Sequence, residues 1–226
     1  MKRKLFTTAL SLALAGVLCM GLAACNDVDP WKMESVEVTA EQWAEAFKPD
    51  NFQNVKIEIV MTQTSREEDA KLTVKGTVVV ADDVQYIKTE AKAKGSPEWK
   101  ALAKGMNEER YSSKSQGEYT VIYRDKKGKW TQSSDEAGLA DAVIAEYVSY
   151  GVLYTLFTFE DAETGYTADP GAESVSAREL SGIRLKFKDG KIAAFFSEKS
   201  LYQGDIVQVV TFTYGGQKLT LPSAED

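Results

Sequence analysis

Histidine is absent from this 226-residue chain, and cysteine occurs only twice, as Cys19 and Cys25. Without histidine the chain lacks the usual general base near neutral pH, the Ser-His-Asp triad and the commonest zinc ligand. Beyond residue 25 there is no thiol, which excludes disulfides, thiol catalysis and cysteine metal sites there. We therefore expect a protein that is not an enzyme, with no catalytic residue, metal or cofactor.

Basic residues are outnumbered, since 27 Lys and Arg stand against 34 Asp and Glu, for a formal charge of −7. Residues 1–24 contain three basic residues and no acid, so the remainder has a charge of −10. This balance argues against a nucleic-acid partner and against adhesion to anionic lipid, both of which select clustered Lys and Arg. No linker rich in Pro, Gly or Ser divides the chain, and residues 37–226 are expected to form a single domain.

The N-terminus has the most specific pattern in the sequence. Basic residues at positions 2–4 precede an apolar run, which ends in Leu22-Ala23-Ala24-Cys25. A positive start, an apolar stretch and small residues before a cut are typical of a secretory signal. Residues 1–24 resemble a bacterial lipoprotein signal peptide with its lipobox. The resemblance implies cleavage before Cys25, a diacylglycerol thioether on Cys25, and usually a further acyl chain such as palmitate on its amino group.

Two or three acyl chains exceed the single chain that anchors a protein only marginally. We therefore expect a lipid-anchored protein on the extracytoplasmic face of a cell membrane, with residues 25–36 as the lipidated cysteine and a tether. The alternatives are a cleaved secretory peptide without lipid and an uncleaved membrane anchor.

Alternation of apolar and polar residues predicts strands over most of the remaining chain. Asp189-Gly190 predicts a two-residue hairpin turn, and Arg66-Glu67-Glu68-Asp69 predicts a solvated hairpin tip. Residues 96–107 fit either a short helix or an excursion between strands. The expected strands cover 55–62, 72–80, 84–88, 109–114, 118–123, a strand that begins near 130, 183–187, 192–196 and 206–214.

Two helices are predicted. Residues 38–47 have Thr39 and Gln42 at the spacing of a capping box, and Trp43 and Phe47 share the face expected to pack inward. Residues 134–150 are expected to form a longer helix, capped by Ser134 or Asp135 and closed by Gly151. Two acids inside the apolar run 137–157 argue against a membrane span.

These elements predict an α+β fold with a curved antiparallel sheet covered by helices. Their order, together with Lys186-Phe187-Lys188-Asp189-Gly190-Lys191 and Phe212-Thr213-Tyr214-Gly215-Gly216, resembles the lipoprotein-carrier-like fold. Bacterial lipoprotein carriers and mycobacterial lipid-binding lipoproteins share that fold. The resemblance implies an open half-barrel around helices, with an apolar cavity for acyl chains.

Three functional hypotheses remain open. The first is a site for a lipid or another hydrophobic ligand, since an apolar cleft is what such a ligand requires. The same alternation also fits a close-packed core without a cavity. The candidate ligand-binding residues are Ile57, Ile59, Val74, Leu139, Val143, Tyr147 and Leu185.

The second hypothesis is a surface lipoprotein that holds a partner through exposed aromatic residues and has no small-molecule ligand. The third, an enzyme, requires paired carboxylates. Glu160, Asp161 and Glu163 are adjacent, but they fall in a predicted turn and are expected to be solvated. The aromatic residues available to the second hypothesis are Trp31, Trp99, Tyr111, Tyr119 and Tyr202.

Overall fold

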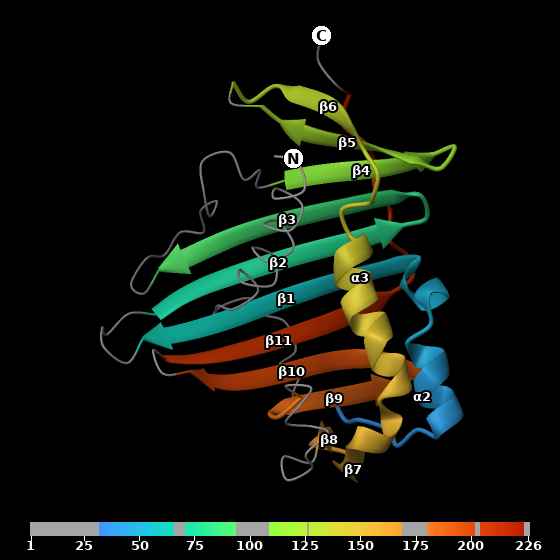
Figure 1. The fold of residues 1–226 in the computed structure, drawn as a ribbon, viewed down its shortest axis with the longest axis vertical. Coiled ribbons are helices and arrows are strands. Elements are labelled where there is room, and N and C mark those ends of the chain that lie inside the picture. Colours follow the sequence, from blue (N-terminus) through green and yellow to red (C-terminus); the bar gives the residue numbers. More distant parts are fainter. Residues whose placement is uncertain are drawn as a thin grey trace, which may run out of the picture.

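A computed structural model describes residues 32–65, 71–93, 109–125, 127–168, 180–201 and 204–223. Eleven strands within these ranges form one antiparallel sheet that does not close (Figure 1). The strands are β1 (Asn54–Ser65), β2 (Lys71–Ala81), β3 (Val84–Ala93), β4 (Glu109–Ser115), β5 (Glu118–Arg124), β6 (Trp130–Asp135), β7 (Phe157–Asp161), β8 (Gly165–Ala168), β9 (Ile183–Lys188), β10 (Lys191–Leu201) and β11 (Gly204–Tyr214).

The first and last strands meet at the centre of the sheet. The order is β6-β5-β4-β3-β2-β1-β11-β10-β9-β8-β7, so each half of the sheet is a meander that runs outward from the β1–β11 pair. Val55 lies opposite Tyr214 and Ser65 lies opposite Gly204, so these two strands pair along their whole length. The expected antiparallel sheet with covering helices is confirmed at this level.

The described helices lie on one face of the sheet, which we call the inner face (Figure 1). The α-helices are α2 (Ala40–Ala46) and α3 (Asp141–Val148), and the 3₁₀ turns are η2 (Pro49–Phe52), η3 (Ser149–Val152) and η4 (Tyr154–Leu156). The predicted capping box of α2 is confirmed. The Gln42 backbone N–H donates to the Thr39 hydroxyl at 3.3 Å, and the Thr39 N–H donates to Gln42 Oε1 at 2.8 Å.

The helix expected over 134–150 is wrong at both ends. Ser134 and Asp135 belong to β6, where they pair with Thr120 and Tyr119 of β5. Strand pairing therefore outweighs the local capping signal, and α3 begins only at Asp141. Beyond Val148 the chain tightens into η3 and η4, so Gly151 lies in a 3₁₀ turn and does not close the helix.

The nine expected strands are present, but β7 and β8 were not predicted. They are short and lie at the edge of the sheet, so little alternation is available to indicate them. Asp161 Oδ1 accepts a hydrogen bond of 2.6 Å from the Thr164 N–H and thereby shapes their connecting turn. Glu160, Asp161 and Glu163 are exposed, as expected, but Glu160 and Asp161 belong to β7 and not to a turn.

The Asp189-Gly190 turn is confirmed, with φ of 52° and 72° at the two residues. The expected tip at 66–69 and the stretch 96–107 lie outside the described residues, as do Cys25, Trp31, Trp99 and Tyr202.

Trp43 lies at the centre of the core between the helices and strands β7, β8 and β9. Its indole is fully buried, and Nε1 donates to the Tyr150 carbonyl at 2.8 Å. Both Trp43 and Phe47 face inward, as predicted. The rings around Trp43, with centroids 5.0–5.7 Å away, belong to Phe47, Tyr154, Phe157, Tyr166 and Phe187.

The chain before α2 packs against β9. The Val36 N–H donates to the Phe187 carbonyl at 2.9 Å, and the buried Ser35 hydroxyl accepts from the Phe187 N–H at 3.0 Å. The Lys186 ammonium, which has no exposed surface, donates to the Met33 carbonyl at 2.8 Å. The described fold therefore includes residues from Met33 onward.

Candidate ligand-binding face

The register identifies which side chains share the inner face. Residues directly opposite one another in an antiparallel pair point to the same side. Ile57 lies opposite Val78 on β2 and Phe212 on β11, and Ile59 lies opposite Val210. The inner face at the middle of the sheet is therefore apolar across three neighbouring strands.

The structure brings most of the predicted ligand-binding residues together. One buried hydrophobic cluster contains five of them, and Leu139 is partly buried against it. Val74 is buried on the same face, opposite Met61, but it lies outside that cluster. The five residues in the cluster are Ile57, Ile59, Val143, Tyr147 and Leu185.

A network of hydrogen bonds holds the start of α3 against β3 and β4. The sequence analysis did not identify this network. Gln85 of β3 is buried on the inner face, where its Nε2 donates to Asp141 Oδ1 at 2.8 Å. Its Oε1 accepts from the Ala140 N–H at 2.8 Å and from the Ser112 hydroxyl at 3.3 Å. Ser112 in turn accepts from the Leu139 N–H at 3.2 Å.

These bonds replace an ordinary helix cap. The N-cap residue of α3 is Ala140, whose side chain accepts no hydrogen bond, so groups from the sheet bind the free N–H groups instead. Asp141 Oδ2 also accepts from the Gly138 N–H at 2.8 Å. A Cβ at Gly138 would overlap the Gln85 amide, so this approach requires glycine. The available signal was Gln85 itself, a polar residue on the apolar face of its strand.

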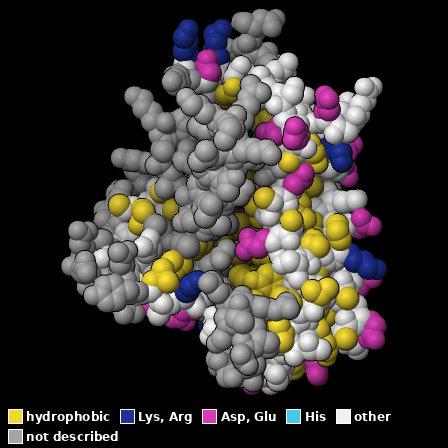
Figure 2. All heavy atoms as spheres, in the orientation of Figure 1, with side chains coloured by type: hydrophobic (Ala, Val, Ile, Leu, Met, Phe, Trp, Pro, Cys, Tyr) yellow, Lys and Arg dark blue, Asp and Glu magenta, His cyan; other side chains and the backbone are white. Residues whose placement is uncertain are grey.

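An apolar hollow lies beside α3. Figure 2, in the orientation of Figure 1, shows hydrophobic side chains at the bottom of this hollow, over β11 and β10. Val210 and Phe195, which lie opposite each other on the inner face of these strands, are 0% and 2% exposed and belong to the packed core beneath that surface. An acidic side chain is visible beside the hollow (Figure 2).

Of the two acids on α3, Asp141 is bonded to Gln85, and Glu146 is the other. Successive residues of an α-helix are about 100° apart, so with Val143 and Tyr147 against the sheet, Ile144 and Glu146 stand on opposite flanks.

The Glu146 carboxyl has a shifted pKa. Its side chain is exposed to solvent, yet desolvation raises the pKa of its carboxyl above the ordinary value of 4.5. Among the described residues, no cation lies within ion-pair distance of Glu146 and no group donates a hydrogen bond to its carboxylate.

Tyr147 adds a second polar group without a partner. Its ring packs against Phe195 and Phe212, with centroids 5.8 Å and 5.0 Å away, and the side chain has no exposed surface. The hydroxyl has no hydrogen-bond partner in the part of the chain that the structure describes. Burial, followed by the nearby charge of Glu146, raises the pKa of this phenol well above its usual value.

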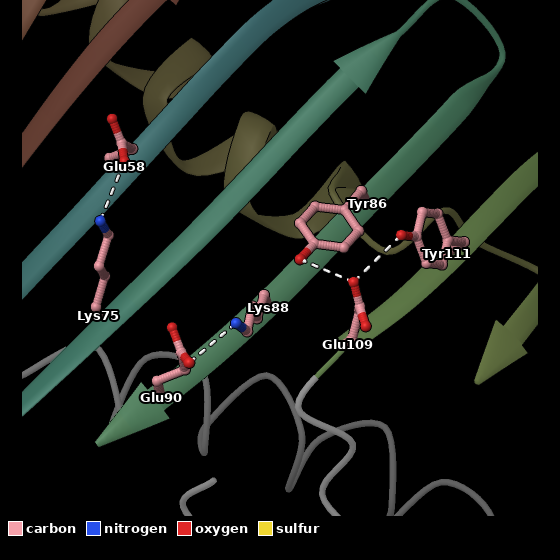
Figure 3. Close-up of polar contacts among 7 residues, drawn as sticks. All are labelled: Glu58, Lys75, Tyr86, Lys88, Glu90, Glu109 and Tyr111. Atoms are coloured by element: carbon pink, nitrogen blue, oxygen red, sulfur yellow. Dashed lines mark hydrogen bonds and ion pairs between the residues drawn. The ribbon is translucent and has the colours of Figure 1, made fainter. Parts of the chain in front are cut away.

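The opposite, outer face of the sheet has a group of aromatic residues at its upper end. Tyr86 and Tyr111 are half-buried, with ring centroids 4.9 Å apart, and both hydroxyls donate to Glu109 Oε1, at 3.4 Å and 3.3 Å (Figure 3). Trp130 meets Tyr111 edge to face at 5.7 Å, and the Arg124 guanidinium lies 4.4 Å from the Trp130 ring. Of the predicted surface aromatics that the structure describes, Tyr111 belongs to this group and Tyr119 does not.

Tyr119 lies instead on the inner face. It pairs with Lys114 and Asp135, in the same register that brings Val121 opposite Ser112. Burial, followed by the charge of Asp141 and a hydrogen bond to it, raises the pKa of the Tyr119 phenol. Tyr119 is therefore next to the start of α3 and does not extend the outer aromatic group.

Two further features of the described residues bear on other kinds of site. No group of three or more His, Cys, Asp and Glu side chains is close enough to hold a metal ion in those ranges. Each described helix is also too short or too polar to span a bilayer, and the apolar run 137–157 is divided among α3 and two 3₁₀ turns.

No model of a known protein family matches the chain, and no curated protein matches it. The function is therefore argued from the arrangement of the side chains.

Proposed function

We propose that this protein is a membrane-anchored, extracytoplasmic bacterial lipoprotein that binds a lipid or another hydrophobic ligand and does not catalyse a reaction. The main support is the apolar hollow beside α3, over β10 and β11 (Figure 2). Ligand sites of this kind are concave and mostly apolar, with few polar groups that orient the ligand. Glu146 and Tyr147 are polar groups of that kind.

The topology agrees with the proposed lipoprotein-carrier-like fold. An open antiparallel sheet of eleven strands with helices on one face leaves an apolar inner surface larger than two short helices cover. We propose that this open sheet is the half-barrel that the resemblance implied.

A fluorescence titration tests ligand binding. The chain 26–226 contains every described element, and N-phenyl-1-naphthylamine is a neutral probe that fluoresces in apolar surroundings. We expect a saturable increase in emission that corresponds to about one probe per chain. A linear, non-saturable signal would overturn the proposed ligand site.

The proposed anchor depends on Cys25. Intact-mass measurement of the full chain, recovered from bacterial membranes, is expected to show a protein that begins at Cys25 and has two or three acyl chains. The Cys25→Ser variant should lose these acyl chains and leave the membrane fraction. A wild-type mass without lipid, or with residues 1–24 still attached, would contradict the anchor.

The outer aromatic group supports the alternative function, a surface lipoprotein that holds a partner. Tyr86, Tyr111 and Trp130 lie on β3, β4 and β6 and are each half-buried, and Tyr and Trp rings often form the centre of protein interfaces. Affinity capture with the wild-type chain and with Trp130→Ala as bait separates the two functions. A protein that binds the wild-type bait but not the Trp130→Ala bait supports the alternative.

A further inference from the structure

We infer that one end of the domain, where Val36 and Val152 are exposed, rests on the lipid bilayer that holds Cys25. We call it the tether end, and it consists of residues 33–38, the turn η3 and the end of β9 at Phe187. This inference rests on the proposed function, because it requires lipid on Cys25. It adds an interaction surface and its partner, a phospholipid surface.

The fold binds the chain firmly directly after the tether. The Ser35 N–H donates to the Ala162 carbonyl at 2.7 Å, between β7 and β8. The buried Lys186 ammonium donates to the Met33 carbonyl at 2.8 Å, and both backbone groups of Phe187 bond the same segment. The chain is therefore fixed to the β7–β9 side of the sheet from Met33 onward.

The chain between the anchor and this attachment is short. Eight residue steps separate Cys25 from Met33, and an extended chain spans at most about 3.5 Å per step, so the two lie no more than about 28 Å apart. The eleven residues of β10 alone extend about 36 Å. A tether shorter than this strand confines its attached end to the bilayer surface, while the far ends of the strands can stand away from it.

Two of the most exposed apolar side chains belong to the tether end. Among the described residues, the large hydrophobic side chains that are exposed are Val152 at 85%, Val36 at 46% and Leu201 at 39%. Val36 belongs to the attached segment, since its N–H donates to the Phe187 carbonyl at 2.9 Å.

Contacts through α2 place η3 at the same end. A Cβ at Gly151, the residue before Val152, would lie 3.2 Å from the Cβ of Phe47 on α2. The Phe47 ring meets the Phe187 ring edge to face, with centroids 5.9 Å apart. Figure 1 shows the turns after α3 and the chain that leads into α2 together at the lower right of the molecule.

The fold presents Val152 to its surroundings from an anchored turn. Tyr150 and Leu153 on either side of it are buried, and the Tyr150 carbonyl accepts a hydrogen bond from Trp43 Nε1 at 2.8 Å. Exposed apolar side chains are stabilised in the interfacial region of a bilayer, and a short tether gives them a high effective concentration there. This contact does not require the clustered basic residues that an acidic chain lacks.

Site-specific quenching tests the inference, because the sequence after Cys25 contains no other cysteine. The full chain with Val152→Cys is labelled with bimane and reconstituted into phosphatidylcholine vesicles with a nitroxide on some lipid head groups. We expect the bimane at position 152 to lose about half or more of its emission relative to vesicles without nitroxide. The label at Val36→Cys, the other exposed apolar position of the tether end, is expected to be quenched as well.

Leu201→Cys is the matched control. Leu201 is also an exposed apolar residue, but it lies nine residues along β10 from Ile192, the partner of Phe187, and is therefore about 30 Å from the tether end. We expect little quenching at position 201. Equal quenching at positions 152 and 201, or stronger quenching at 201, would overturn the assignment of the tether end.

The result also distinguishes the inference from the proposed anchor. If the intact mass shows lipid on Cys25 and the chain stays on the vesicles, but the label at position 152 is not quenched, the anchor stands and the tether end is wrong. If Cys25 has no lipid and the chain does not stay on the vesicles, the anchor itself is wrong, and the contact fails with it.

Discussion

At the scale of single residues, a few side chains determine how the two helices sit on the sheet. Trp43 joins α2, η3 and the lower strands through ring contacts and one hydrogen bond to Tyr150. Gln85 likewise holds the start of α3 on the sheet, through hydrogen bonds to Ala140 and Asp141. Glu146 differs from both because its carboxylate has no partner among the described residues.

Trp43→Ala is expected to lower the free energy of unfolding by about 3–5 kcal/mol, because the lost indole leaves a cavity among five rings. Urea unfolding followed by circular dichroism measures this loss. Trp130→Ala, which removes a half-exposed indole from the outer face, is the matched control and should cost less. Equal losses would show that Trp43 is not the centre of the core.

Glu146 predicts a pH dependence of stability. Its pKa is raised in the folded chain, so between the ordinary value of 4.5 and the raised value the folded state binds more protons than the unfolded state. Stability therefore falls as pH rises through that window. Glu146→Gln should have a higher Tm than the wild-type chain at pH 7, and the difference should close below pH 4.5. A Tm difference that is the same at both pH values would contradict the desolvation of this carboxyl.

At the scale of elements, the sequence predicted the helices, strands and turns whose local residue pattern agrees with their tertiary contacts. The capping box of α2 and the Asp189-Gly190 turn are local signals, and both are confirmed. The start of α3 could not be predicted locally. Ser134 and Asp135 look like helix caps but pair with β5, while the groups that bind the first turn of α3 come from Gln85 and Ser112, more than 25 residues away.

The candidate site shows the same limit. Alternation indicated the apolar strand residues, since it reports which face is buried, and it therefore identified Ile57 and Leu185. Alternation cannot indicate a hollow, because a hollow depends on where α3 crosses the sheet. Glu146 was noticed only as a charge inside an apolar run.

Gln85→Ala is expected to loosen the start of α3, since the Ala140 N–H and the Asp141 carboxylate lose their partner. We expect a loss of about 1–3 kcal/mol in the free energy of unfolding and faster amide exchange in α3. Gln132→Ala removes an exposed glutamine from β6 and serves as the control. Unchanged exchange in the Gln85 variant would contradict the role of the network in docking the helix.

Val143→Trp tests α3 as a wall of the site. Val143 is 2% exposed between the helix and the sheet, so a larger ring is expected to displace α3, cost about 1–3 kcal/mol and weaken probe binding. Ala145→Trp places the same ring on the exposed side of α3 and should change neither property. A folded Val143 variant with wild-type probe affinity would show that α3 does not border the ligand.

At the scale of the whole molecule, the sheet topology accounts for the inner face. Because β1 and β11 pair at the centre, the two halves of the sheet extend outward and leave two edges, at β6 and β7. Short helices cover part of the resulting face, and the hollow lies beside them (Figures 1 and 2). In the proposed function, lipid on Cys25 keeps this domain next to a membrane, which is also a source of hydrophobic ligands.

Native mass spectrometry of chain 26–226, purified from bacterial cells without detergent, tests the hydrophobic site most directly. The account predicts a population heavier than the polypeptide by the mass of one lipid, which returns to the polypeptide mass after extraction with organic solvent. A native mass equal to that of the polypeptide alone, with no lipid in the extract, would contradict it.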